Sequence, residues 1–282
     1  MTSPPSGADI FAGQVGDPDL LAAIYDLEHD EVTSDLAFYR LLASRDPAPV
    51  LDLGCGSGRL FRPVLEGGAT RVIGVDGSPA LLRRAEARIA ADPDLSAARD
   101  GGRLQLVLGD VRRPPVSDLL RMTIAVGVLP HLDGPEEAVR MLVASARRLD
   151  RAGRLVLDDI GPAGLPWRDL PISVDWEREL AGDRVVRRSQ LTRRETPEGL
   201  RVDYVTLTDT VRPDGTIARL PASFRLWYPS WVVLEQLLDT AGFAVELTYG
   251  SHDLDPFHDD SERRIVIARR VQSGAGQRAR RR

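Results

Sequence analysis

Lysine and asparagine are both missing from this 282-residue chain, and all 37 of its basic residues are arginine. Both missing amino acids have AT-rich codons, so a GC-rich genome accounts for their absence without any special arginine chemistry. Cys55 is the single cysteine. It excludes an internal disulfide framework and leaves the redox compartment open, so we expect a cytoplasmic protein by default.

Long apolar runs are also missing. No stretch approaches the roughly 18 consecutive apolar residues of a membrane span, and the first residues, MTSPPSGADIFAGQ, lack the basic start and apolar core of a signal peptide. The net charge of −5 provides no general attraction to phosphate backbones. We therefore expect neither a membrane nor a nucleic-acid partner.

Strands and helices alternate over residues 18–160 and 229–271, which predicts one α/β core preceded by N-terminal helices. Crossovers of this length imply a parallel sheet with both faces covered. The Pro/Gly/Ser-rich residues 1–17 are expected to be mobile, and the arginine-rich residues 272–282 a disordered tail.

This alternation stops over residues 161–228. Three segments there read as strands: DRVVRRSQLTRRE, GLRVDYVTLTDTV and TIARLPASFRLWY. They are joined by TPEG and RPDG, which are turns of the kind that close antiparallel hairpins. The sequence thus predicts an antiparallel sheet inserted into the α/β core.

A glycine-rich loop follows the first core strand, in the stretch VLDLGCGSGRL. Gly54, Gly56 and Gly58 have the spacing G-x-G-x-G, whereas a dinucleotide-binding loop needs glycine at the position of Arg59. The shorter pattern suits close wrapping of backbone around a ligand without a pyrophosphate. Asp76 and Asp110 end the next two strands, where they can meet a ribose and an adenine amine.

Four ordered motifs resemble those of class I S-adenosylmethionine-dependent methyltransferases: VLDLGCGSGRL, VIGVDGS, LVLGDVRRP and RRLDRAGRLVLDD. The layout is closest to small-molecule (glycine and sugar) N-methyltransferases. The resemblance implies a Rossmann-like, seven-stranded, mostly parallel sheet whose last strand is antiparallel. It implies S-adenosyl-L-methionine as cofactor, and a cofactor site made by Asp52, Gly54, Cys55, Gly56, Gly58, Asp76, Gly77, Asp110, Val111 and Val126.

Each of these positions also has a simpler structural interpretation. Gly56 could serve the turn, Asp76 could cap the following helix, and Asp110 could cap a turn before Pro114. Cys55 has no basic partner nearby in the sequence, so we interpret it as a small side chain packed behind the loop rather than as a nucleophile.

Two residues are candidates for catalysis. His131 follows the fourth strand, where it could face the methyl acceptor or instead cap the helix that follows. Tyr25, in the segment IYDLEHDE, resembles the tyrosine that reaches over the cofactor's methyl group in amine and sugar N-methyltransferases; the alternative is simple packing on the sheet.

The acidic, histidine-containing loop 251–263 could contact a substrate or hold a metal, but we assign no metal site to it.

The inserted sheet resembles the one that covers the acceptor pocket in glycine and sugar N-methyltransferases, and it could mediate a homodimer. The candidate residues to line such a pocket are Trp167, Trp176, Phe224, Trp227 and Tyr228. The resulting prediction is a methyltransferase acting on an amine or hydroxyl of a small molecule. The alternatives are a cofactor-binding enzyme of cyclisation or elimination, and a non-catalytic partner subunit.

Overall fold

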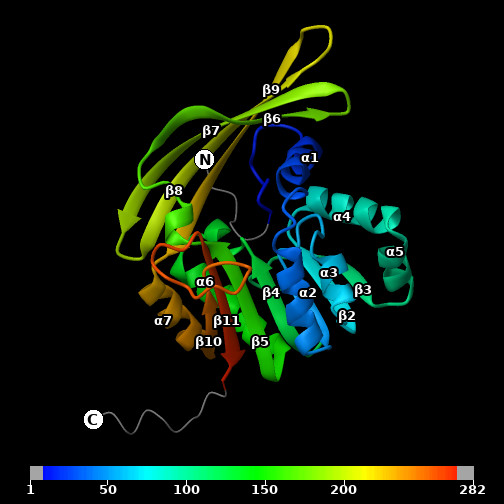
Figure 1. The fold of residues 1–282 in the computed structure, drawn as a ribbon, viewed down its shortest axis with the longest axis vertical. Helices are drawn as coiled ribbons and strands as arrows, with labels where there is room; N and C mark the ends of the chain where they lie inside the picture. Colours follow the sequence, from blue (N-terminus) through cyan, green and yellow to red (C-terminus); the bar gives the residue numbers. More distant parts are fainter. Residues whose placement is uncertain (1–8, 272–282) are drawn as a thin grey trace.

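The computed structural model describes residues 9–271 (Figure 1). A seven-stranded sheet forms its centre, with the order β10-β11-β5-β4-β1-β2-β3. Its strands are β1 (Pro49–Leu53), β2 (Arg71–Asp76), β3 (Leu104–Leu108), β4 (Leu120–Val126), β5 (Leu149–Ile160), β10 (Phe243–Tyr249) and β11 (Arg263–Arg270). All neighbours pair in parallel except β11, which runs antiparallel to both β10 and β5. The predicted fold class is confirmed.

Helices cover both faces of this sheet. One face packs against α2 (Leu36–Arg45), α3 (Phe61–Glu66), α4 (Pro79–Ala91) and α5 (Pro93–Asp100). The other packs against α6 (Pro135–Arg148) and α7 (Trp231–Ala241). The sequence analysis missed α5, which begins directly after α4 because Asp92 accepts hydrogen bonds from the backbone of Asp94 and Leu95. Short 3-10 turns occur at Leu129–His131 and Pro162–Gly164.

The inserted sheet has four strands, not the three that were predicted. They are β6 (Leu170–Leu180), β7 (Asp183–Thr196), β8 (Gly199–Val211) and β9 (Ile217–Pro229), paired antiparallel in that order. Strand β6 was missed because it is an edge strand exposed on most of its length, so its sequence lacks a one-sided apolar alternation. The two predicted hairpin turns join β7 to β8 and β8 to β9.

The inserted sheet lies over helix α1 (Pro18–His29), as Figure 1 shows at the top of the molecule. Leu21, Ala22 and Ile24 of α1 share a buried cluster with Leu220 and Ala222 of β9. The end of β9 enters the main core itself, where Trp227 is fully buried. The inserted sheet is therefore attached to the core both directly and through α1.

The N-terminal segment also contacts this sheet. The side-chain amide of Gln14 donates to the carbonyl of Ser223 (2.6 Å) and accepts from its backbone N–H (2.9 Å). Phe11 is buried nearby. Residues 1–8 of the segment predicted to be mobile, and the whole tail 272–282, lie outside the described residues.

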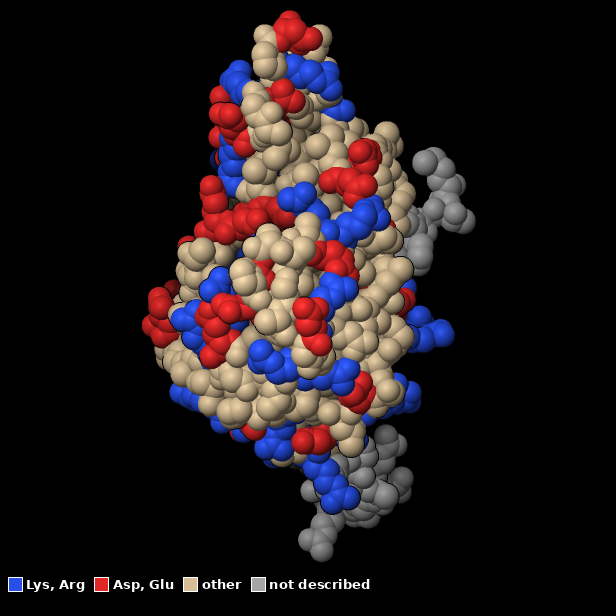
Figure 2. Space-filling view, turned by 90° about the vertical axis from the view of Figure 1, so that its right-hand side faces the viewer, with Lys and Arg blue, Asp and Glu red and all other residues tan. Residues whose placement is uncertain are grey.

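Arginines and carboxylates alternate over the face drawn in Figure 2, without a broad area of one sign. Many charged side chains of the described residues are paired: Arg62, for example, contacts both Glu66 and Asp92. None of the helices within residues 9–271 has the length and apolar character needed to cross a bilayer.

Candidate functional site

The glycine-rich loop after β1 is held by the neighbouring strand. The backbone N–H groups of Gly54 and Cys55 both donate to the carbonyl of Val75, at 2.7 and 3.0 Å. Gly54, Gly56 and Gly58 all have positive φ, between 55° and 79°. A side chain at position 54 would also place its Cβ 2.6 Å from Val128. The loop backbone can adopt this path only with glycine at these positions.

Asp76, at the end of β2, fixes the loop from its far side. Its Oδ2 accepts from the N–H of Gly56 and its Oδ1 from that of Ser78, both at 2.8 Å. The N-cap of α4 is Ser78 rather than Asp76. Burial raises the pKa of Asp76 to about 6, against the lowering effect of these hydrogen bonds. Each oxygen keeps a further lone pair for a ligand.

Two adjoining cavities open beside this loop. The first, which we call the inner cavity, measures about 70 Å³. Predicted cofactor residues and both catalytic candidates line it: Gly54, Gly56, Asp76, Gly77, Val111, Val126, Tyr25 and His131. The second, the central cavity, measures about 330 Å³. Its lining includes Asp52, Gly54, Cys55, Val126, Tyr25 and His131. His252 and Arg263 of the candidate loop 251–263 also line it, as does Arg59, which was not predicted.

Two predicted cofactor residues line neither of these cavities. Gly58 serves the turn, where its N–H donates to the carbonyl of Cys55 (3.0 Å). Asp110 is engaged by Arg112, whose Nε donates to Oδ1 at 2.9 Å and whose Nη2 donates to Oδ2 at 2.6 Å. Its neighbour Val111 does face the inner cavity.

Cys55 is packed behind the loop, as the simpler interpretation held. Its side chain is buried, and its thiol contacts the carbonyl of Gly56 at 3.8 Å. A Cβ added to Gly74 of β2 would lie 2.9 Å from its sulfur, which shows how closely the thiol meets the strand. Burial, together with the nearby Asp52 and Asp76, raises the pKa of this thiol. The thiolate needed of a nucleophile is therefore disfavoured.

Charged groups gather on the wall of the central cavity near the loop. Burial and the adjacent Asp76 raise the pKa of Asp52 to about 7, while Arg59 opposes the shift. The Arg59 guanidinium makes two hydrogen bonds to Asp35, at 2.6 and 2.7 Å. In the sequence, position 59 was informative only as the place where a glycine is missing. Its contact with the cavity depends on α2 and could not be inferred from that pattern.

Tyr25 lies directly above the loop. Its hydroxyl is 3.2 Å from the position that a Cβ on Gly56 would take, and its ring stacks on that of His29 at 4.0 Å. Burial is the main cause that raises the pKa of Tyr25, so the phenol is protonated at neutral pH. A tyrosine in this place can contact any molecule held between the loop and α1.

His131 is half-buried and lines the inner and central cavities and two more beneath the inserted sheet. Burial lowers its pKa to about 4, with a smaller contribution from His29. The imidazole is therefore neutral under ordinary conditions. Helix α6 begins at Gly134 without a side-chain cap, so the alternative role of His131 as a helix cap is not what the structure shows.

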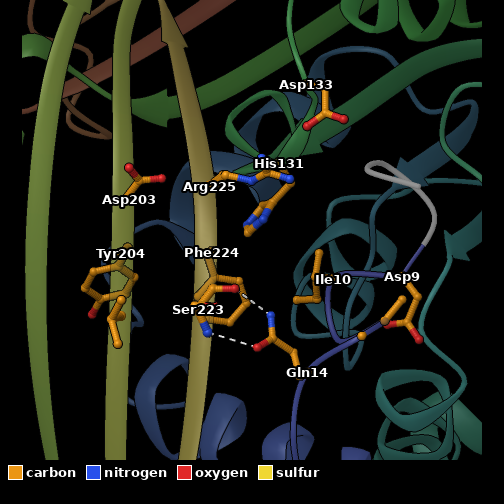
Figure 3. A pocket seen from close by; sticks show the side chains of 13 residues that line it. Asp9, Ile10, Gln14, His131, Asp133, Asp203, Tyr204, Ser223, Phe224 and Arg225 are labelled. Atoms are coloured by element: carbon orange, nitrogen blue, oxygen red, sulfur yellow. Dashed lines mark hydrogen bonds between the residues drawn. The ribbon is translucent and has the colours of Figure 1, made fainter. Parts of the chain in front are cut away.

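The two further cavities lie between the inserted sheet and the N-terminal segment, and α1 lines the smaller of them. The sheet cavity, of about 180 Å³, is lined by Tyr25, Glu28, Arg187 and Phe224 among others. The outer cavity, of about 430 Å³, appears in Figure 3, where His131 projects between β9 and the segment that carries Ile10.

Only some of the aromatic residues predicted for a roof face these cavities. Phe224 lines both the sheet and the outer cavity, and Tyr228 lines the central cavity. Trp227 belongs to the main core instead, and Trp167 is 77% exposed. Trp176 packs toward α1, where its indole N–H donates to Glu28 at 3.2 Å.

Loop 251–263 does not gather its acidic side chains and histidines into one group. His252 turns inward to Asp158 of β5 at 2.8 Å, whereas His258, Asp259 and Asp260 are exposed. Over residues 9–271, no three His, Cys, Asp or Glu side chains lie where they could hold a metal ion.

The residues that line the inner and central cavities are of the types that would bind S-adenosylmethionine. Gly54 lies on both cavities; the inner one adds Gly56 and Asp76, and the central one adds Asp52 and Arg59. A nucleoside with an amino-acid chain needs these same features: close backbone approach, a ribose acceptor, and charges for an amino and a carboxylate group.

Comparison with known proteins agrees with this geometry. Residues 50–153 match a family model described as "Methyltransferase domain". A malonyl-[acyl-carrier protein] O-methyltransferase of Halalkalibacterium halodurans is 28% identical over 204 residues, 70% of this chain and 66% of the relative. A trans-aconitate 2-methyltransferase of Streptomyces avermitilis is 42% identical over 142 residues, 49% of each chain.

Solved structures of similar fold include the sugar N-methyltransferase KedS8 of Streptoalloteichus sp. ATCC 53650. It has a TM-score of 0.70 and 18% identity, and the match covers 96% of this chain and 99% of that one. The chain spans less than two thirds of the length of either curated relative named above. The resemblance to S-adenosylmethionine-dependent methyltransferases is thus confirmed: residues 50–153 match the methyltransferase-domain model, and the fold is similar to that of KedS8.

Proposed function

We propose that this protein transfers a methyl group from S-adenosylmethionine to an amine or hydroxyl of a small molecule. The observation that carries the proposal is the position of Tyr25 and His131. Both residues line the glycine-walled inner cavity, and both also line the sheet cavity beneath the inserted strands. A cofactor on one side of this pair and an acceptor on the other would meet there.

The cofactor, when bound, supplies a methyl group activated by a positively charged sulfur. Asp76 would accept hydrogen bonds from the ribose hydroxyls through its remaining lone pairs, and Gly54 and Gly56 would allow the backbone close approach. Asp52 and Arg59 would meet the amino and carboxylate groups of the amino-acid chain. Most of the rate enhancement would come from holding the two reactants in line and away from water.

On the acceptor side, the Tyr25 hydroxyl and the neutral His131 imidazole would hold the attacking atom by hydrogen bonds. The sheet cavity gives an acceptor both apolar contacts, from side chains such as Phe224, and polar ones, from Glu28 and Arg187. The named relatives methylate a malonyl group on a carrier protein and trans-aconitate, and KedS8 acts on sugars. These three chemistries define the first acceptors to test.

The experiment combines labelled S-adenosylmethionine with a panel of amino sugars as amine and hydroxyl acceptors, and with trans-aconitate and malonyl-carrier protein as acceptors that react at a carboxylate. His131→Ala is expected to lower kcat about 100-fold and Tyr25→Phe about 10-fold. Both variants should change the cofactor Kd, measured by calorimetry, no more than about twofold. His258→Ala, on an exposed loop, serves as the control. Failure of the wild type to bind the cofactor would refute the function, and full turnover in both variants would refute the two roles.

We further propose that the protein forms a homodimer through strand β6. This edge strand exposes Ile172 and Val174, which are 50% and 58% accessible, beside the exposed Trp167. An edge strand with apolar side chains is a template for pairing with another strand. Analytical ultracentrifugation should give a dimer for the wild type and a monomer for Val174→Arg. A wild-type monomer at micromolar concentrations would contradict this assembly.

A further inference from the structure

A carboxylate at the end of β5 accepts hydrogen bonds from three side chains. Asp158 is fully buried, and it accepts from the Tyr39 hydroxyl (2.5 Å), from Nε2 of His252 (2.8 Å) and from Nε of Arg263 (3.0 Å). These donors come from α2, the loop after β10, and β11. Burial raises the pKa of Asp158, but the hydrogen bonds from His252 and Tyr39 and the positive charge of Arg263 outweigh it and lower the pKa below its usual value.

His252 is the member of this group that also faces the central cavity. It lines that cavity together with Tyr25 and His131, and its side chain is 14% exposed. Its ring is held in place by the ring of Phe38, at 5.7 Å, and that of Tyr39, at 6.2 Å. The imidazole is thus oriented by packing as well as by hydrogen bonding.

The hydrogen bond determines which nitrogen remains available. An ionised carboxylate can only accept, so Nε2 of a neutral His252 must carry the proton that it donates to Asp158. The lone pair then resides on Nδ1. A carboxylate that fixes the tautomer in this way also stabilises the imidazolium that forms when the ring takes a second proton.

His131 lacks this support. No hydrogen bond to its ring is present among the described residues, and burial lowers its pKa to about 4. A proton placed on His131 would have no carboxylate to compensate its charge. Three histidines line the central cavity: His29, His131 and His252. Within residues 9–271, His252 is the one of these three whose ring is hydrogen-bonded to a carboxylate, so it is the best base among them.

We propose that His252, oriented by Asp158, takes the proton from a methyl acceptor whose attacking atom lies beside Tyr25 and His131, where these residues line the central cavity with His252. The inference rests on the proposed methyl transfer and extends it to a residue that the sequence motifs do not contain. The O–H bond of a hydroxyl, or one N–H bond of a protonated amine, would break and leave its electron pair on the oxygen or nitrogen, and the proton would bond to Nδ1. That pair would form the new bond to the methyl carbon as the carbon's bond to sulfur breaks, with its electrons left on the sulfur. The imidazolium faces the carboxylate of Asp158 and later releases the proton to water.

The test uses His252→Gln, which keeps a donor for Asp158 but offers no basic nitrogen. His258→Gln is the matched control, because it changes an exposed histidine of the same loop. With the amine or hydroxyl acceptor that the wild type methylates fastest, His252→Gln should lower kcat by about 100-fold. Its Kd for S-adenosylmethionine, by calorimetry, should stay within twofold of the wild type.

The dependence of kcat on pH separates a base from a structural role. Because His252→Gln has no nitrogen that can take the proton, its kcat should depend on pH differently from that of the wild type. Asp158 is hydrogen-bonded to the ring and Tyr39 lies against it, so Asp158→Asn should also change the pH profile. Equal pH profiles for wild type and His252→Gln, or a cofactor affinity lost together with turnover, would overturn the proposal.

A second measurement is independent of any acceptor. Nitrogen-15 spectra of histidine-labelled protein, assigned with His252→Gln, should show the Nε2–H tautomer of His252 at pH 8. A majority of the Nδ1–H tautomer would overturn the proposal even if no panel member is methylated. Cofactor binding is measured separately, so a wild type that does not bind S-adenosylmethionine would refute the proposed function. The tautomer of His252 would then decide the inference by itself.

Discussion

Replacing Asp76 by alanine is expected to weaken S-adenosylmethionine binding about 100-fold. Hydrogen bonds to a charged group contribute about 1.5–3 kcal/mol each, and about 1.4 kcal/mol corresponds to a factor of ten. The variant would lose the ribose contacts and also the anchor of the loop at the Gly56 N–H. Calorimetry measures the effect. Asp94→Ala, which removes an exposed carboxylate on α5, is the control.

The same carboxylate should make cofactor binding depend on pH. The pKa of Asp76 in the folded protein is raised from 3.8 to about 6, so the side chain gains a proton as the pH falls through 6. The protonated form is a weaker acceptor for the ribose, so affinity should decline below about pH 6. Because the folded state holds this proton more tightly than the unfolded state, the contribution of Asp76 to stability should rise as the pH falls from 6 toward 4.

Affinity of Asp76→Ala equal to that of the wild type would show that the ribose lies elsewhere. Asp76→Asn separates charge from shape, since it keeps the side chain's size and one carbonyl acceptor. We expect it to bind the cofactor with intermediate affinity and without the decline below pH 6. A decline that persists in Asp76→Asn would assign the titration to Asp52, whose pKa is raised to about 7.

Trp227→Ala is expected to lower the free energy of unfolding by about 3–5 kcal/mol. The indole is fully buried at the end of β9, where it packs in one cluster with Leu234 of α7. Its removal would leave a cavity at the place where the inserted sheet joins the core. Unfolding in urea, followed by far-UV circular dichroism, measures the loss.

Trp167→Ala is the matched control, because this indole is 77% exposed and should cost less than about 0.5 kcal/mol. Similar small losses in both variants would mean that β9 does not contribute to the main core. A biphasic transition in Trp227→Ala, with a single transition in the wild type, would show instead that the indole couples the inserted sheet to the rest of the protein.

The fold was predictable because local signals agreed with one another along most of the chain. Ser78 and Pro79 mark the start of α4, and apolar runs mark the buried parallel strands. Strand β6 and helix α5 were not predictable in the same way. An exposed edge strand carries little apolar periodicity, and Asp92 both ends one helix and begins the next.

The candidate site likewise contains residues that the sequence predicted and residues that it did not. The inner cavity is built from residues close to strand ends, such as Gly54 and Asp76, and the motifs predicted most of them. The arrangement of Asp158 with His252 spans 94 positions and depends on the return of β11 beside β5. No pattern in the sequence connects these residues, so only the folded chain reveals them. The pairing of Arg59 with Asp35 escaped prediction for the same reason.

The cavities that meet at His131 have different structural origins. The inner cavity is walled mainly by the loop ends of the parallel sheet, whereas the sheet and outer cavities are walled largely by β7, β8, β9 and the N-terminal segment. Under the proposed function, substitutions on the inserted strands would therefore alter acceptor choice while the glycine-rich loop stays intact. Such a division would favour evolvability, because a lineage would explore new acceptors through changes in one part of the chain under constant selection on the other.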